Sequence, residues 1–111
     1  MKLGSEYRLY TISQHTTLNL DDLIDDCMNL LSAVTLDQDT SEKFLKVEQK
    51  LRQTEKLENI DKMYKRKKEI LFQDIFDVLD DISPEGCYFG THPAGLALIG
   101  YWDKNLFSAT R

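Results

Sequence analysis

The chain has few of the residues that would place it in a specialised structural class. It contains 2 cysteines, 5 glycines and 2 prolines among 111 residues. Two cysteines are too few for a disulfide-rich scaffold, and the low glycine and proline content excludes collagen-like and linker-like chains. No apolar run reaches the roughly 18 residues that a membrane-spanning helix needs, so we expect no membrane partner. The length predicts a single domain over residues 1–111.

The charge balance excludes some partners. The chain carries 14 Lys or Arg against 19 Asp or Glu, a net charge of −5. General nucleic-acid binding needs a basic surface, so nucleic acid is not expected as a partner. The N-terminal residues lack the apolar core of a secretion signal, and Cys27 and Cys87 are predicted to be small buried side chains in a reducing compartment. We therefore expect a cytoplasmic protein.

The first half of the chain predicts one strand followed by a helix. Residues 6–12 are rich in Tyr, Leu, Ile and Thr, which is typical of a strand. Residues 20–34 have helical apolar spacing, with Asn19 as the N-cap. A loop over 35–40 follows, in which Asp39 and Glu42 have the spacing of a capping box that opens the next helix.

A helical pattern without glycine or proline then runs from about residue 41 to residue 82. Its apolar residues form two stripes, one through Phe44, Val47 and Leu51 and one that runs from Leu57 through Ile60 and Tyr64 to Ile82. The stripes are about 140° out of phase on a helical wheel, which predicts a break within 54–58. One long helix with partners on both sides is the alternative.

The C-terminal part predicts a β-hairpin. Strands at 86–92 and 96–102 are joined by a turn at 92–95, and Gly90 and Gly100 are expected to mark bulges or close approach of a neighbouring backbone. Residues 106–110 have the composition of a short last strand. The predicted fold is α+β in the order β-α-α-β-β, with a small antiparallel sheet from the N-terminal strand and the hairpin packed on two or three helices.

Two aspartate clusters, at 21–26 and 77–81, are the clearest candidate sites. On the helical wheel both clusters lie away from the apolar stripes, which favours solvated faces that could bind a basic partner. The alternative is that they meet in a common cleft and hold Mg²⁺, as in a small phosphohydrolase. No zinc-ligand spacing and no nucleotide-binding loop occurs, so neither a metal nor a cofactor is expected.

An aromatic group and a basic run are two further features of the sequence. The aromatic group around Tyr88 and Trp102 is predicted to be core, with a part that could form a recognition surface beside His92. The basic run of Lys62, Lys65, Arg66, Lys67 and Lys68 is spread around its helix and predicted to be a solvated turn.

These features favour a non-catalytic protein-binding module of the inhibitor, immunity or regulatory type, which docks on another, basic protein. The candidate binding residues are Asp21, Asp22, Asp25, Asp26, Tyr88, His92 and Trp102. Association into a homodimer through residues 41–82 is a further alternative.

Overall fold

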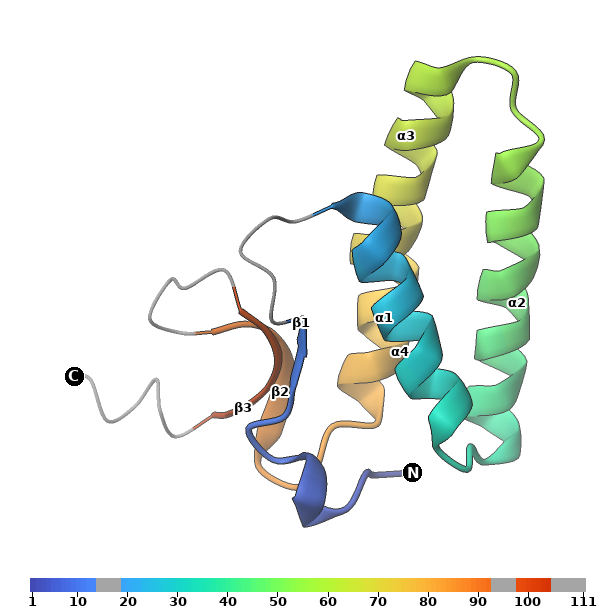
Figure 1. The fold of residues 1–111 in the computed structure, drawn as a ribbon. Coiled ribbons are helices and arrows are strands. Elements are labelled where there is room, and N and C mark those ends of the chain that lie inside the picture. The colour runs from blue at the N-terminus through green and yellow to red at the C-terminus, as the bar shows by residue number, and fades with distance from the viewer. Residues whose placement is uncertain (14–18, 93–97, 105–111) are drawn as a thin grey trace.

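The computed structural model describes residues 1–13, 19–92 and 98–104 and has the predicted α+β architecture (Figure 1). A 3₁₀ turn at Ser5–Tyr7 precedes the first strand, and a π-helical segment (the π segment, Ile70–Ile75) joins the last two helices. In chain order the other elements are β1 (Thr11–Ser13), α1 (Leu20–Ala33), α2 (Gln38–Glu55), α3 (Ile60–Glu69), α4 (Phe76–Asp81), β2 (Cys87–Thr91) and β3 (Ile99–Asp103).

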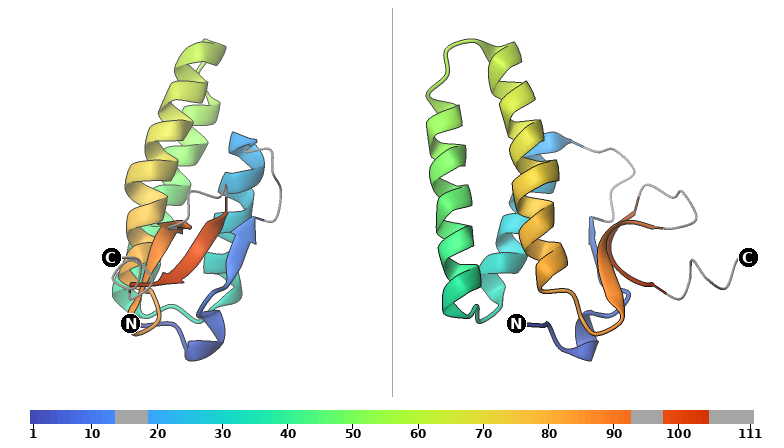
Figure 2. Two further views of the ribbon diagram at one scale, coloured as in Figure 1. Left: turned by 90° about the vertical axis from the view of Figure 1, so that its left-hand side faces the viewer. Right: turned by 180° about the vertical axis from the view of Figure 1, so that it is seen from behind.

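The three strands form one antiparallel sheet in the order β1-β3-β2. The central strand is β3, and its residues 99–102 are all buried, which explains why this segment is apolar on both faces. The strand β1 contacts α1 and the strand β2 contacts α4. Figure 2 shows the helices together on one side of the sheet.

The core lies where the sheet meets the helices. Its largest fully buried side chain is that of Tyr101 on β3, whose hydroxyl donates a hydrogen bond of 2.9 Å to the carbonyl of Leu79 on α4. This bond ties the C-terminal end of α4 to the central strand. The other large side chains that are fully buried are Leu31, Ile70, Leu71, Ile75, Leu79, Ile82 and Cys27.

The helices α2 and α3 form an antiparallel hairpin that extends beyond α1 and the sheet (Figures 1 and 2). The predicted break is confirmed, because α2 ends at Glu55 and α3 begins at Ile60. The second apolar stripe is only partly buried, because Leu57, Ile60 and Tyr64 at its N-terminal end lie outside the core. Their side chains are exposed, at 77% for Ile60 and 57% for Tyr64, because this end of the hairpin has no neighbouring layer to cover it.

Two local predictions near the N-terminus of the fold are wrong. The strand expected at 6–12 is confined to residues 11–13, since the chain first makes the 3₁₀ turn and then passes through Leu9 at φ +62°. The loop expected to reach residue 40 ends earlier. The N-cap of α2 is Asp37, whose carboxylate accepts a 2.9 Å bond from the Thr40 amide, so Asp39 lies inside the helix.

Gly100 confirms the expected close approach of two backbones. A Cβ at this position would lie 2.9 Å from the Cα of Thr11 and 3.0 Å from the carbonyl carbon of Tyr10. Most of the predicted turn at 92–95 and the short strand predicted at 106–110 lie outside the described residues. None of the helices in the described ranges combines the length and apolar content needed to cross a membrane.

Candidate functional site

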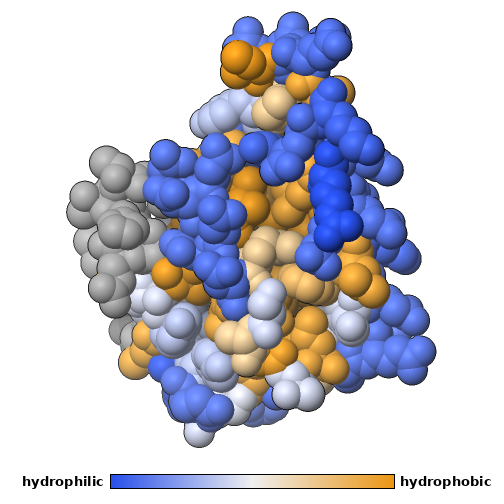
Figure 3. All heavy atoms as spheres, turned by 45° about the vertical axis from the view of Figure 1, so that its right-hand side comes forward, coloured by the Kyte–Doolittle hydropathy of each residue, from blue (hydrophilic) through white to orange (hydrophobic). Residues whose placement is uncertain are grey.

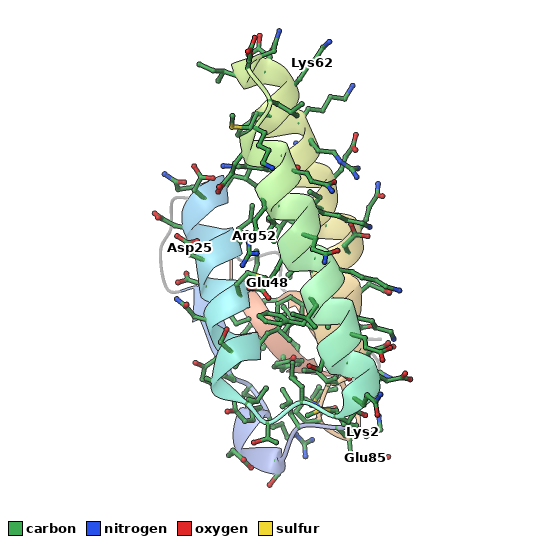
Figure 4. All side chains as sticks on the ribbon, turned by 90° about the vertical axis from the view of Figure 1, so that its right-hand side faces the viewer. Lys2, Asp25, Glu48, Arg52, Lys62 and Glu85 are labelled. Atoms are coloured by element: carbon green, nitrogen blue, oxygen red, sulfur yellow. The ribbon has the colours of Figure 1, made fainter. Side chains whose placement is uncertain are left out.

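The four aspartates of α1 form an acidic surface, which we call the aspartate face (Asp21, Asp22, Asp25 and Asp26). The helix buries its opposite side against the core through Leu23, Ile24, Cys27, Leu30 and Leu31. Asp21, Asp22 and Asp25 are exposed and Asp26 is half-buried. Figure 4 shows Asp25 on the side of α1 turned away from α2. The helical wheel therefore placed these side chains correctly.

Most of this negative charge is not neutralised within the described residues. Asp21 forms an ion pair with Lys67 of α3, at 3.1 Å between Oδ1 and Nζ. No ion pair to a described residue joins Asp22, Asp25 or Asp26. The first turn of α1 favours acidic residues through the helix dipole, which explains Asp21 and Asp22 but not Asp25 and Asp26 further along the helix.

Asp26 also lines a hollow between α1 and the segment before β1, which we call the tyrosine pocket. Its volume is about 330 Å³, and the residues that line it are Tyr7, Tyr10, Ile12, Asp26, Asn29, Leu30 and Ala33. The two tyrosine rings meet edge to face, with centroids 5.4 Å apart and planes inclined at 62°. Asp22, Asp26 and Asn29 succeed one another at helical spacings of four and three residues, so one row of α1 leads into this pocket.

The local chain path brings the two tyrosines together. The amide of Tyr10 donates a 3.0 Å bond to the carbonyl of Tyr7, and between them Leu9 occupies the left-handed region of backbone conformation. That conformation is uncommon for a residue other than glycine, and such positions occur in tight turns and cluster at functional sites. An ion pair between Arg8 and Asp103 and a 2.9 Å bond from the Tyr101 amide to the Tyr10 carbonyl hold this turn on the sheet.

A strip of hydrophobic surface borders the aspartate face on the side opposite the tyrosine pocket, toward α2 (Figure 3). Figure 3 shows this strip between the hydrophilic ridges of α1 and α2. Both helices carry half-buried hydrophobic side chains that pack against the core, namely Leu20 and Met28 on α1 and Phe44 and Leu51 on α2. A molecule that docks on the aspartates can therefore also cover apolar surface.

The aromatic and histidine candidates lie on the β-hairpin, away from α1 in sequence. Trp102 is only 5% exposed, and its indole N–H donates a 2.9 Å bond to the Gly90 carbonyl. The rings of His92 and Trp102 meet edge to face at 4.6 Å. The half-buried Tyr88 donates to the Thr91 carbonyl, and burial raises the pKa of its hydroxyl. Trp102 and Tyr88 thus have structural partners within the hairpin, and Trp102 offers little surface for recognition.

The second aspartate cluster engages elements other than α1. The Asp80 carboxylate accepts a 2.9 Å bond from the Phe89 amide of β2, and Asp81 forms a 2.8 Å ion pair with Lys43 of α2. Within the described residues, no three His, Cys, Asp or Glu side chains gather closely enough to hold a metal ion. These carboxylates therefore connect secondary-structure elements to one another.

Comparisons with protein-family models, with curated proteins and with solved structures found no match. The chemistry of the surfaces themselves is what indicates a function. The tyrosine pocket was not predicted from the sequence, because Tyr7 and Tyr10 were assigned to a regular strand. The only signal that could have pointed to it was the presence of two tyrosines three residues apart.

Proposed function

We propose that this chain is a non-catalytic protein-binding module that docks on a basic partner through the aspartate face and the tyrosine pocket. One observation carries the proposal. The half-buried Asp26 carboxylate lies in a hollow with two tyrosine rings and has no ion pair with any described residue. A carboxylate beside aromatic rings is the arrangement that attracts an arginine or lysine side chain.

The energetics support a cationic side chain from another protein. Contact with a tyrosine ring contributes about 0.5–2 kcal/mol, more when water is excluded. A charge-assisted hydrogen bond to a carboxylate contributes about 1.5–3 kcal/mol. The neighbouring Asp22 and Asp25 add attraction at longer range, which raises the association rate of a basic partner. The apolar strip between α1 and α2 supplies the surface burial that charges alone do not provide.

The rest of the chain is compatible with a scaffold for this surface. The core contains Tyr101, Cys27 and Leu79 of α4, all of which are fully buried and inaccessible to a ligand. Both cysteines are free and buried, as expected for a protein that acts in a reducing compartment such as the cytoplasm.

Affinity capture with matched variants tests the proposal. The immobilised protein, the variant D22N/D26N and the control E58Q/E85Q are each incubated with extract from the cells of origin. Both variants remove two negative charges, but Glu58 and Glu85 are exposed and lie outside α1 and the pocket. A partner that is retained by the wild type and the control, lost by D22N/D26N, and released as salt rises supports the proposal. A partner that D22N/D26N captures as well as the wild type does contradicts it.

A further inference from the structure

A second pocket, which we call the hairpin pocket, lies between α2 and α3 and shares no lining residue with the tyrosine pocket. Its volume is about 500 Å³. Its charged lining consists of Lys50 from α2 and Lys62, Lys65, Arg66 and Glu69 from α3. Figure 4 shows Lys62 near the end of the hairpin that is remote from the sheet. Four cations and one carboxylate thus surround a single hollow.

Only part of this positive charge is balanced within the described residues. Lys50 forms an ion pair with Asp74 at 3.1 Å, and Arg66 pairs with Glu69 at 3.2 Å. Lys62 and Lys65 are exposed and have no ion pair with any described residue. The pocket therefore holds two unpaired ammonium groups together with two cations that have partners.

The cluster contrasts with the charge of the whole molecule. Residues 56–68 contain six Lys or Arg and two Asp or Glu, a net charge of +4, although the whole chain has a net charge of −5. Lys62 lies three residues before Lys65 and four before Arg66, and like charges at these spacings repel one another across a helix surface. This local concentration of positive charge is a favourable environment for a negatively charged ligand.

The shape of the pocket limits what that ligand can be. Its volume is within the ~300–1,000 Å³ that small-molecule sites occupy. Leu57 is 40% exposed and lines the pocket beside the cations. The buried Thr54 hydroxyl already donates to the Lys50 carbonyl, so the polar groups that remain in the lining are the four cations, the Glu69 carboxylate and the Gln53 amide.

We infer that the hairpin pocket binds a small phosphate-rich anion, in which two or more phosphate groups lie close together. Several cations around one hollow match the charge density of linked phosphates, and an arginine fork beside lysines is a common phosphate-binding combination. Glu69 is the one charge of the lining that opposes binding, and its ion pair with Arg66 reduces that opposition. The site is separate from the aspartate face, so it stands or falls independently of the proposed protein partner.

Calorimetric titration with inorganic tripolyphosphate tests this inference in low-salt buffer. The test variant is K62Q/K65Q, which removes the two unpaired cations of the pocket. The matched control is K56Q/K68Q, which removes the same charge from the same basic segment at two exposed lysines outside the pocket lining. We expect K62Q/K65Q to weaken binding at least about 10-fold, and K56Q/K68Q to weaken it less than about 2-fold.

A second arm separates free phosphates from lipid headgroups. Vesicles of phosphatidylcholine, with and without phosphatidylinositol bisphosphate, are sedimented with the three proteins. Retention that requires both the phosphorylated lipid and Lys62 with Lys65 would assign the site to a headgroup, whereas tripolyphosphate binding alone would assign it to a free ligand. Equal loss of binding in the two variants would show attraction to general positive charge and overturn the inference. The absence of binding in both arms would overturn it as well.

Discussion

Replacing Gly100 by alanine is the substitution that tests the fold most sharply. Gly100 lies on the central strand, where β1 crosses closely. A Cβ there would collide with the backbone at Tyr10 and Thr11, and backbone cannot turn aside as a flexible side chain can. The two strands must separate, so the bond from the Tyr101 amide to the Tyr10 carbonyl is weakened as well.

The expected cost of G100A follows from these contacts. Overpacking in a close-packed interior costs about 1–3 kcal/mol, and a lost hydrogen bond costs about 0.5–1.5 kcal/mol. The smaller backbone entropy of alanine in the unfolded chain offsets about 0.4–1 kcal/mol. We therefore expect the free energy of unfolding to fall by about 2–3 kcal/mol, which lowers Tm by about 8–20 °C in a domain of this size.

Urea unfolding followed by the fluorescence of Trp102, the single tryptophan, measures this change. The control is G86A, because Gly86 has φ +75° but no atom within 4 Å of the added Cβ. Strain without a clash should cost about 1 kcal/mol. A G100A protein that loses less than about 0.5 kcal/mol, or no more than G86A, would refute the close approach of β1 and β3.

Three other perturbations have defined outcomes. Y101F should lower the free energy of unfolding by about 1–2 kcal/mol in urea melts, since the buried Leu79 carbonyl loses its partner; an unchanged midpoint would contradict this. Hydrogen bonds from Thr40, with a smaller contribution from the N-terminal ammonium, lower the pKa of Asp37 to about 2. As pH falls, Asp37 is protonated near its ordinary pKa of 3.8 in the unfolded chain but only near 2 in the folded protein. The stabilising contribution of the ionised Asp37 is therefore lost between these two pKa values. The variant D37N should show a shallower loss of stability between about pH 5 and 2. An identical profile would show that the fold does not lower the pKa of Asp37. Burial raises the pKa of the Cys27 thiol to about 12, so iodoacetamide at pH 8 should modify Cys27 in urea but not in the native protein, as read by mass spectrometry; rapid native modification would show that α1 is not packed as described.

The helices could be predicted from the sequence because their signals are local. Asn19 caps α1 through its side chain, and the apolar spacing that follows defines the buried face. The phase change between the two apolar stripes located the break before α3. The exposed Ile60 could not be recognised in this way, since its burial depends on whether another layer covers the end of the hairpin.

The N-terminal segment shows where local reasoning fails. Its composition is typical of a strand, but only tertiary contacts decide the outcome. Gly100 brings β1 onto the sheet at Thr11, and the Arg8–Asp103 pair holds the turn before it. Leu9 at positive φ is a consequence of that packing and has no counterpart in the sequence pattern.

The candidate sites also differ in whether they depend on local sequence pattern or on tertiary packing. The exposure of the aspartates on α1 follows from helical periodicity, which the sequence contains. The tyrosine pocket depends on Tyr7 and Tyr10 packing beside Asp26, which lies at least sixteen residues further along the chain. The hairpin pocket likewise exists only once Lys50 of α2 lies opposite the basic run of α3, so the run alone looked like a solvated turn.

Photocrosslinking at the rim of the tyrosine pocket tests the central claim most directly. A photoreactive amino acid is placed at Asn29, which lines the pocket, and in a separate protein at Glu58, which is exposed on the hairpin. Both proteins are irradiated in the cells of origin. Docking of a basic partner on α1 predicts that position 29 gives an adduct with one defined protein. This adduct should disappear when the substitutions D22N/D26N are made in the same chain, and position 58 should give no adduct of that mass. No adduct at position 29, or the same adduct from position 58, would contradict the account.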